Sequence, residues 1–467
     1  MTEIRFGTDG WRGRMGREFS FRNVRRFASA YSRFLTGRLR IREPRIFINH
    51  DTRILSRRFA LETARTFSLH GVMSFIPPRD VPLAAASLAI VDHEMDGGVA
   101  FTASFNGPVF NGIKVFNSRG APALPSTTTL IEREIKKLPE DWDLPRQYPD
   151  KSRIHEIQPR EAYLQTIAEQ IDFQAIRRAG MKIVVDNLFG ASREFMDELL
   201  LENGIPIECI HSYPYAGSGK VIPYCSGETL KDLSRVVRET GARIGLATDI
   251  DGDRFGVIDH RGVFVDANRV VPMVLDYLIR VRGMQGGVVK SISSTRNIAH
   301  VARYHGRKLY HTPVGFKYIS DMMSKRDAFI GVESTNGAAL KGRAIIKDGI
   351  LFNLLILEMM AHEGKDLQVL TKEMNKRFPS LHAAEISLKA TEYRMERVRE
   401  LMDKNDGADP GFKPAKVQFV DGVKWIGDSE WLLIRPSGTQ KVVRIYAESP
   451  NRSRTRELIQ HGRGIIG

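Results

Sequence analysis

The amino-acid sequence predicts an α/β protein built from three related α/β mixed-sheet domains and a C-terminal α+β domain. Three observations support this fold class. The chain has 467 residues, 42% of them hydrophobic, which is enough for several packed cores. Strand-like apolar runs alternate with segments of helical period in three successive blocks. After residue 375 this alternation gives way to short strands between two helices.

The first block spans residues 1–150 and ends in a segment rich in proline and charge. Apolar residues recur at helical spacing after Ser20, a residue type that often caps helices, and again before Gly71, which favours a helix end. Short apolar runs follow each helix. We therefore expect helices at 19–35 and 57–69, and strands at 45–50, 72–76, 98–101 and up to 116.

The next two blocks, residues 151–265 and 266–375, repeat this order of elements without repeating the sequence. In the first of them we expect strands at 181–186, 206–210 and 243–248 and helices at 194–202 and 230–239. In the second we expect helices at 271–280, 297–304 and 350–362 and strands at 287–292 and 328–332.

The last block, residues 376–467, has a different order of elements. We expect helices at 392–402 and from 454 onward, and strands at 416–420, 424–426, 431–434 and 442–447. Several short strands in succession favour a sheet of their own, which makes this block an α+β domain.

The composition favours an anionic small-molecule partner. The formal net charge is +15 and the pI is near 9.7, but the basic residues are spread along the chain and no nucleic-acid-binding motif accompanies them. No apolar stretch approaches the ~18 residues of a spanning helix and no export signal is present, so we expect a cytoplasmic protein without a membrane partner. Cys209 and Cys225 lack metal-binding spacing, which indicates ordinary thiols.

A loop in the first block carries a candidate phosphate carrier. The stretch V-A-F-T-A-S-F-N-G-P-V-F-N-G-I-K-V-F places Ser104 at the end of a strand, with Lys114 in the strand that follows the loop. A hydroxyl presented in this way can act as a nucleophile or carry a phosphoryl group. The alternative is a loop whose Ser104 and Asn106 satisfy their own backbone.

The second block contains a candidate metal site. The strand at 243–248 runs into D-I-D-G-D-R, in which Asp249, Asp251 and Asp253 can direct hard oxygen ligands at one point. A calcium loop is excluded, because its sixth and twelfth positions would be Arg254 and His260. The pattern favours Mg²⁺, and the alternative is an exposed acidic turn.

Four further loops carry polar groups suited to an anionic, hydroxyl-rich ligand. F-G-T-D-G-W-R-G supplies Arg12 among closely spaced glycines, T-P-V-G-F-K-Y-I supplies Thr312, and G-V-E-S-T-N-G supplies Glu333, Ser334 and Asn336. In the last block R-P-S-G-T-Q-K offers a guanidinium, two hydroxyls and free N–H groups, which suits a phosphate dianion. Ordinary turns remain the alternative for each.

These motifs, in this order and over nearly the whole chain, resemble the α-D-phosphohexomutase superfamily, the bacterial phosphoglucomutases and phosphomannomutases. The resemblance implies three α/β domains and a TATA-binding-protein-like C-terminal domain around a central cleft. It further implies that Ser104 carries a phosphoryl group that passes to a sugar monophosphate. The resulting hexose 1,6-bisphosphate, which also serves as activator, turns around and returns its other phosphate to Ser104.

The resemblance also assigns roles to individual residues. The catalytic residues would be Ser104, Arg12 and Lys114. The ligands of Mg²⁺ would be Asp249, Asp251, Asp253 and an oxygen of the phosphorylated Ser104. The substrate would be bound by Arg254, Lys290, Thr312, Glu333, Ser334 and Asn336. The substrate's phosphate would be bound by Arg435, Ser437, Gly438 and Thr439.

The sequence departs from the family pattern in several loops. The usual T-A-S-H-N-P has Phe105 and Gly107 in place of His and Pro, and Val332 stands where the sugar loop G-E-E-S-G-G has its first Glu. Gln440-Lys441 replace Glu-Pro, and Ile250 replaces a Gly without altering a metal ligand. We therefore expect a phosphohexomutase for glucose or mannose phosphates, acting as a monomer or homodimer. The alternative is a weakly active or inactive relative that binds phosphosugars as a sensor or scaffold.

Overall fold

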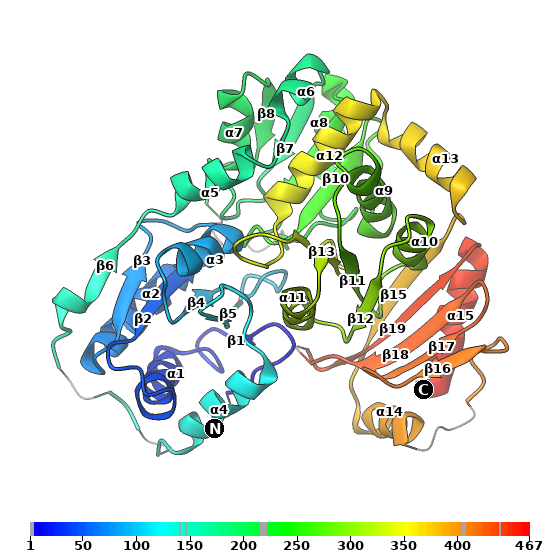
Figure 1. Cartoon of the computed structure of the whole chain (residues 1–467). Helices are drawn as coiled ribbons and strands as arrows, with labels where there is room; N and C mark the ends of the chain where they lie inside the picture. The colour runs from blue at the N-terminus through cyan, green and yellow to red at the C-terminus, as the bar shows by residue number, and fades with distance from the viewer. Residues whose placement is uncertain (1–3, 140–141, 145–146, 215–221, 404–407, 439) are drawn as a thin grey trace. The chain divides into compact units, whose positions relative to one another are not determined.

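The computed structural model describes residues 4–139, 142–144, 147–214, 222–403, 408–438 and 440–467 (Figure 1). The chain divides into two compact units, Met1–Ala267 with Thr335–Gln368, and Asn268–Ser334 with Val369–Gly467. Three α/β sheets precede an antiparallel C-terminal sheet, so the predicted fold class is confirmed.

The first sheet of the first unit has the strand order β1-β5-β4-β2-β3-β6. Its central strands run parallel, whereas β5 runs antiparallel to both of its neighbours. The strands are β1 (Trp11–Arg14), β2 (Arg45–His50), β3 (Met73–Ile76), β4 (Gly97–Phe101), β5 (Phe110–Asn117) and β6 (Ile154–Glu156).

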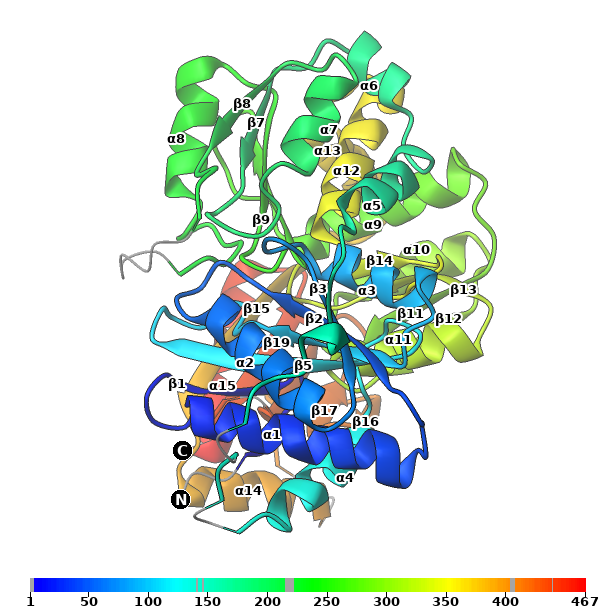
Figure 2. The same cartoon turned by 90° about the vertical axis from the view of Figure 1, so that its left-hand side faces the viewer.

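Helices cover both faces of this sheet (Figure 2). Val99 of β4 packs in a core with residues of α1, α2 and α4, whereas a Cβ at Gly98 would lie 2.5 Å from Ile90 of α3. Because neighbouring residues of a strand face opposite ways, α3 covers the other face. The Ser20 side chain accepts a hydrogen bond from the Asn23 amide and caps α1 as predicted. The helices are α1 (Phe21–Arg33), continued by a π-helical turn (Phe34–Arg38), α2 (Ser56–Leu69), α3 (Leu83–Asp92) and α4 (Pro125–Lys136).

The second sheet of the first unit has the order β10-β9-β7-β8. The antiparallel pair β9 and β10 is joined by the loop that contains D-I-D-G-D-R. α8 and α12 pack on these strands, and twelve of the fifteen residues of α12 are buried, which accounts for its apolar sequence. The elements are β7 (Ile183–Asp186), β8 (Ile207–Ile210), β9 (Ile244–Thr248), β10 (Phe255–Asp259), α5 (Arg160–Ala168), α6 (Phe173–Arg178), α7 (Met196–Glu202), α8 (Lys231–Thr240), α12 (Gly349–Glu363) and a 3₁₀ turn (Lys151–Arg153). The strand β14 (Ala338–Leu340) also belongs to the first unit but is not a strand of this sheet; it stands next to β13 in the strand order β12-β11-β13-β14.

In the second unit β11 lies between β12 and β13, parallel to both. α10 contacts β11 and β12, while α11 contacts all three strands. The elements are β11 (Gly287–Ser291), β12 (Leu309–Thr312), β13 (Ala328–Val332), α10 (Arg296–Tyr304) and α11 (Phe316–Lys325), and α9 (Ala267–Arg280) begins at the boundary between the units.

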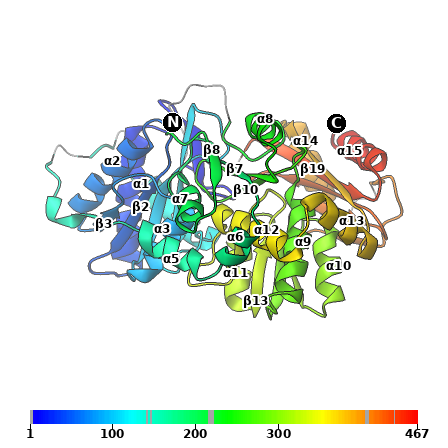
Figure 3. The same cartoon turned by 90° about the horizontal axis from the view of Figure 1, so that it is seen from above.

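The C-terminal sheet of the second unit is antiparallel throughout, with the order β15-β19-β18-β17-β16. α15 lies along β15, β19 and β18, as Figure 3 shows beside β19, and α14 contacts β17 and β18. The elements are β15 (His382–Lys389), β16 (Lys416–Gln418), β17 (Val423–Ile426), β18 (Trp431–Pro436), β19 (Val442–Ser449), α13 (Leu367–Arg377), α14 (Glu392–Asp403) and α15 (Arg452–Ile466).

The structure also contains elements that the sequence analysis did not predict: β1, β6, β10, β12, β14, β15, α3, α4, α5, α6 and α13. Residues 335–368, which the sequence analysis placed with 266–375, pack within the first unit. Among the described residues no helix is both long enough and apolar enough to cross a bilayer.

Candidate functional site

Ser104 lies three residues beyond the end of β4, and it is fully buried. Its φ of +46° is in the left-handed region, which a residue with a side chain rarely adopts. The Ser104 amide donates a hydrogen bond to Oγ1 of Thr102 at 2.9 Å. This conformation needs support from the surroundings, and such strain is found mainly at functional positions.

A buried arginine, Arg53, provides that support. Its Nη1 donates hydrogen bonds to the carbonyl oxygens of Gly107 (2.9 Å) and Phe110 (3.3 Å). Its Nη2 donates to the carbonyl oxygens of Ser104 and Asn106. One guanidinium therefore binds four carbonyls of the serine loop, and sequence analysis did not assign this residue a role.

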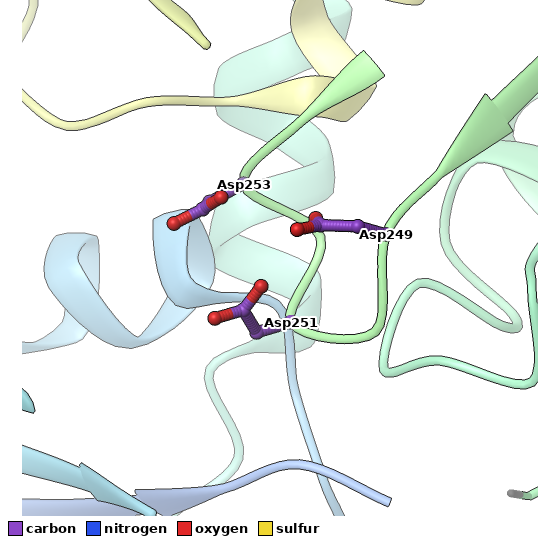
Figure 4. Close-up of side chains that lie close together, drawn as sticks. All are labelled: Asp249, Asp251 and Asp253. Carbon is purple, nitrogen blue, oxygen red and sulfur yellow. The ribbon is translucent and has the colours of Figure 1, made fainter. Parts of the chain in front are cut away.

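The three aspartates of D-I-D-G-D-R converge in the loop between β9 and β10 (Figure 4). Asp249, Asp251 and Asp253 are buried, and one carboxylate oxygen of each lies within 4.8 Å of the others. Burial, and then the negative charges of the other two aspartates, raise the pKa of Asp249 well above its ordinary value. Gly252 makes the sharp bend of this loop with a φ of +69°.

Ser104 faces this group. Its Oγ donates a hydrogen bond to Oδ2 of Asp249 at 3.3 Å and accepts one from Nη1 of Arg254 at 2.5 Å. The same Arg254 Nη1 donates to Oδ2 of Asp249 at 3.1 Å. The serine hydroxyl, one carboxylate of the triad and a guanidinium are thus in direct contact.

Two lysines neutralise part of the negative charge. Nζ of Lys114 lies 2.9 Å from Oδ2 of both Asp251 and Asp253, and 3.2 Å from Oδ2 of Asp9. Burial alone would lower the pKa of Lys114, but these carboxylates raise it. Nζ of Lys347 lies 3.2 Å from Asp253, and although burial opposes it, Lys114 and Lys347 hold the pKa of Asp253 below its ordinary value. Lys347 was not anticipated from the sequence.

Arg12, which was predicted to be a catalytic residue, is held at the same place. Its Nη2 donates a hydrogen bond to Oδ2 of Asp9 at 3.0 Å, and its Nη1 donates to Oδ1 of Asn106 at 2.7 Å. Only 4% of the Arg12 side chain is exposed. The structure therefore brings together Ser104, Arg12, Lys114, Asp249, Asp251, Asp253 and Arg254, all within the first unit.

The carboxylates of the triad suit a hard divalent cation. In the described part of the chain the Oδ1 atoms of Asp251 and Asp253 are buried and accept no hydrogen bond, although Nη1 of Arg254 lies 3.8 Å from Oδ1 of Asp253. A buried carboxylate oxygen without a donor is costly, and a cation bound by oxygen ligands removes that cost. Carboxylate oxygens without nitrogen or sulfur donors favour Mg²⁺ over a transition metal.

Four predicted substrate residues lie in the second unit. Lys290 of β11 is buried, its Nζ donates to the carbonyls of Ser294 (2.7 Å) and Thr295 (2.9 Å), and burial lowers its pKa to about 8. Thr312 is also buried, and its Oγ1 donates to the Pro313 carbonyl at 3.0 Å.

The other two, Glu333 and Ser334, follow β13 directly. Val332 is the last residue of β13 and is fully buried opposite Lys290 of β11, so it is a core residue. The carboxylate that this loop offers is therefore that of Glu333. Oγ of Ser334 lies 2.9 Å from Oγ of Ser293, which adds a second hydroxyl to this loop.

Asn336 was expected to contact substrate, but the structure gives its side chain other partners in the first unit. Its Nδ2 donates to the Cys225 carbonyl at 3.0 Å, and its Oδ1 accepts from the Ala267 amide at 3.3 Å. The residue is buried and has a φ of +59°. Asn336 therefore fixes the chain where it re-enters the first unit.

The residues predicted to bind the substrate's phosphate follow one another at the end of β18. Arg435 is buried, and its Nε donates to Oδ2 of Asp421 at 2.9 Å. The Ser437 amide donates to the Val442 carbonyl at 2.9 Å, and Gly438 is exposed. Thr439, the last of the residues predicted to bind this phosphate, lies outside the described residues.

Four models of the phosphoglucomutase/phosphomannomutase family match this chain in order. They are alpha/beta/alpha domain I over residues 3–141, domain II over 161–262, domain III over 266–378 and the C-terminal domain over 385–461. The chain belongs to this family. Its resemblance to the α-D-phosphohexomutase superfamily is confirmed, and it is a member of a family of isomerases.

Relatives of this phosphohexomutase carry different sugar names. The chain is 27% identical over 464 residues to a phosphoglucomutase/phosphomannomutase of Thermococcus kodakarensis, covering 98% of this chain and 97% of that protein. It is also 27% identical over 428 residues to a probable phosphoglucosamine mutase of Pyrococcus furiosus, with coverage of 91% and 90%. A putative phosphomannomutase from Thermus thermophilus has a similar structure, with a TM-score of 0.86, 29% identity and full coverage of both chains.

Proposed function

We propose that this phosphohexomutase interconverts the 1-phosphate and 6-phosphate of a hexose, glucose or mannose, through a phosphoserine at Ser104 and a hexose 1,6-bisphosphate. The observation that carries the proposal is the contact of the Ser104 hydroxyl with Asp249 and Arg254, beside two carboxylates that each have one oxygen without a hydrogen bond from any described residue. A phosphoryl group on this oxygen would meet cationic side chains and the triad together.

Each transfer exchanges one P–O bond for another. A sugar hydroxyl oxygen bonds to the phosphorus as the bond from phosphorus to Ser104 Oγ breaks, and the proton that the sugar hydroxyl loses is gained by Ser104 Oγ, which leaves a serine hydroxyl. The bisphosphate then returns its other phosphoryl group to Ser104, which leaves the isomeric monophosphate. Such reactions depend mainly on positioning and charge stabilisation, which Arg12, Lys114 and Arg254 supply here.

Mg²⁺ is the proposed cofactor, held by Asp249, Asp251, Asp253 and an oxygen on Ser104. When bound, the ion neutralises charge on the phosphoryl oxygens. The Oδ1 atoms of Asp251 and Asp253, which accept no hydrogen bond from the described residues, support this assignment. An N-acetylphosphoglucosamine mutase of Aspergillus fumigatus with this fold, 15% identical and with a TM-score of 0.52, was solved with GlcNAc-6P and magnesium.

In this proposal Glu333 and Ser334 contact hydroxyls of the sugar. The phosphate that is not being transferred is bound by Arg435, Ser437, Gly438 and Thr439. Because some relatives are named phosphoglucosamine mutases, an amino sugar phosphate is the competing substrate.

A phosphosugar-binding protein with little turnover is the second candidate. The substitution that favours it is Phe105, which stands where the family usually has His beside the serine. The contacts of Ser104, Lys114 and the three aspartates favour the enzyme.

Phosphorus NMR decides between the candidates. The purified protein is incubated with Mg²⁺, glucose 1,6-bisphosphate and the 1-phosphates of glucose, mannose, glucosamine and N-acetylglucosamine in turn. We expect the glucose or mannose signal to convert to that of the 6-phosphate. Conversion of only an amino sugar phosphate would correct the substrate, and binding of a phosphosugar without any conversion would establish the second candidate.

A further inference from the structure

Phe105 contacts both arginines of the serine site. Its ring centroid lies 5.1 Å from Cζ of Arg12 and 5.0 Å from Cζ of Arg254. The ring of Tyr224 completes the group, 5.5 Å from the Phe105 centroid and 5.9 Å from Cζ of Arg254. We name Phe105 and Tyr224 the aromatic bracket.

Both guanidinium groups contact the same ring, and their like charges repel one another. Arg12 and Arg254 are nearly buried, with 4% and 5% of their side chains exposed. Burial lowers the pKa of Arg12; the Asp9 carboxylate raises it, and the charge of Arg254 lowers it further. The negative face of an aromatic ring attracts both cations and adds no charge.

The ring also leaves the N–H groups of the arginines available. Arg254 keeps its Nη1 on Ser104 and Asp249, and Arg12 keeps its two terminal nitrogens on Asn106 and Asp9. A histidine at position 105 would instead compete for these partners or, when protonated, become a third cation between the two arginines.

We propose that Phe105, supported by Tyr224, is a positioning residue that holds Arg12 and Arg254 toward the phosphoryl group on Ser104. The departure from the family's usual His is then a different way of placing the same two guanidiniums, and not a loss of function. This inference rests on the proposed function, because the arginines are positioned for phosphoryl transfer.

Four variants test the proposal. Phe105→Leu keeps the apolar bulk and removes the ring face, whereas Phe105→Tyr keeps the face. Tyr224→Leu removes the second ring. The matched control is Phe75→Leu, which breaks the contact between Phe75 and Arg45 (5.2 Å) on the first sheet, away from Ser104.

We expect Phe105→Leu to lower kcat by about 10-fold or more with KM changed less than about 3-fold, because cation–π contacts mainly hold the arginines in the transition state. Phe105→Tyr should restore kcat to within about 3-fold of wild type, and Tyr224→Leu should show a smaller loss than Phe105→Leu. Phe75→Leu should leave kcat unchanged. An unimpaired Phe105→Leu, or a Phe105→Tyr as impaired as Phe105→Leu, would overturn the proposal.

Chemical modification by phenylglyoxal gives a readout that does not require turnover. Peptide mass spectrometry should show faster modification of Arg12 and Arg254 in Phe105→Leu than in wild type, by about 5-fold or more, with Phe105→Tyr like wild type. The buried Arg53 serves as the internal reference, because general unfolding would expose it too. If wild type shows no mutase turnover, the proposed function fails, and the modification rates alone then test the role of Phe105. Equal modification rates of Arg12 and Arg254 in all variants would overturn that role.

Discussion

The serine loop shows how one side chain can fix a backbone. Ser104 has a φ of +46°, and the loop around it directs four carbonyl oxygens at the Arg53 guanidinium. Arg53 is held in turn by the carboxylate of Asp51, whose Oδ2 lies 3.2 Å from Nε of Arg53. Planar guanidinium groups present several donors in a fixed arrangement, which an ammonium group does not. The conformation of Ser104 therefore depends on a residue that takes no part in the chemistry.

Replacing Arg53 by Lys should loosen this loop. Lysine keeps the charge but cannot reach four carbonyls, and each unsatisfied buried group costs about 1–3 kcal/mol, so we expect a loss of about 2–4 kcal/mol in unfolding free energy. Hydrogen exchange should rise in residues 102–110, and kcat should fall. The control is Arg65→Lys on the surface of α2. Unchanged exchange in the loop would contradict the role given to Arg53.

Replacing Ser104 by Ala should abolish mutase turnover in phosphorus NMR, because the phosphoryl group then has no oxygen to bond to. Calorimetry should show hexose bisphosphate binding within about 3-fold of wild type, since only a hydroxyl is removed. Ser32→Ala is the matched control, because the Ser32 hydroxyl bonds only the Ala28 carbonyl within α1. Turnover retained by Ser104→Ala would rule out the phosphoserine.

At the level of elements, α12 begins directly beside the metal loop. Its cap Asp348 accepts hydrogen bonds from the Leu351 amide (3.0 Å) and the Tyr163 hydroxyl (2.9 Å). The Gly349 amide donates to the Gly252 carbonyl at 3.1 Å. A Cβ at Gly349 would lie 2.3 Å from the Arg254 carbonyl oxygen, so only glycine fits there. The start of α12 therefore supports the loop that carries the triad.

The Asp348 cap makes stability depend on pH. Burial raises the pKa of Asp348 to about 6 from an ordinary value of 3.8, so the folded protein holds a proton that the unfolded chain loses. This contribution to stability is present below about pH 4 and is lost as the pH rises through 6, a change of up to about 3 kcal/mol.

We expect Asp348→Asn, which keeps a capping oxygen and cannot ionise, to escape that loss. Its melting temperature relative to wild type should rise between pH 4 and 7, as measured by circular dichroism. The control is Asp172→Asn, which makes the same change at the cap of α6, where 41% of the Asp172 side chain is exposed. The difference in melting temperature between this variant and wild type should change less with pH than that of Asp348→Asn. A difference for Asp348→Asn that is constant with pH would refute the assignment.

The sequence predicted elements whose period matches their burial. β2 and β13 were predicted at their observed bounds, because strands buried on both faces read as apolar runs. α3 was missed, because its sequence L-A-A-A-S-L-A-I-V-D is apolar on all sides and shows no helical period. β15 alternates between half-buried and exposed positions, and its residues 384–389, A-E-I-S-L-K, carry the matching apolar–polar alternation, so the period of the sequence does indicate this strand.

The residues of the site were predictable only where they lie close together in the sequence. The three aspartates were found because their ligand atoms come from five consecutive residues. Arg53 and Lys347 were missed, because each meets its partners only after folding; Arg53 is 51 residues from Ser104 in the chain. The aromatic bracket was missed for the same reason, since Phe105 read only as the loss of a histidine.

Over the whole molecule the formal net charge is +15, and the proposed substrate is a dianion. Long-range attraction should speed substrate capture at low salt, where charges act over ~30 Å, and weaken at physiological salt, where they act over ~8 Å. We expect kcat/KM to fall by roughly 3- to 10-fold between 10 and 300 mM NaCl, with kcat unchanged. A neutral osmolyte at matched osmolality is the control, and a flat salt profile would show that the net charge does not steer substrate.

The division into two units has a consequence for how the protein can be made. The chain passes between the units at 267/268, 334/335 and 368/369. A gene truncated after codon 267 would therefore encode a first unit without α12 and without Lys347, and its metal loop would lack the support of Gly349. To express the first unit by itself, residues 335–368 would have to be supplied together with residues 1–267. Each unit is therefore encoded by two separate stretches of the gene.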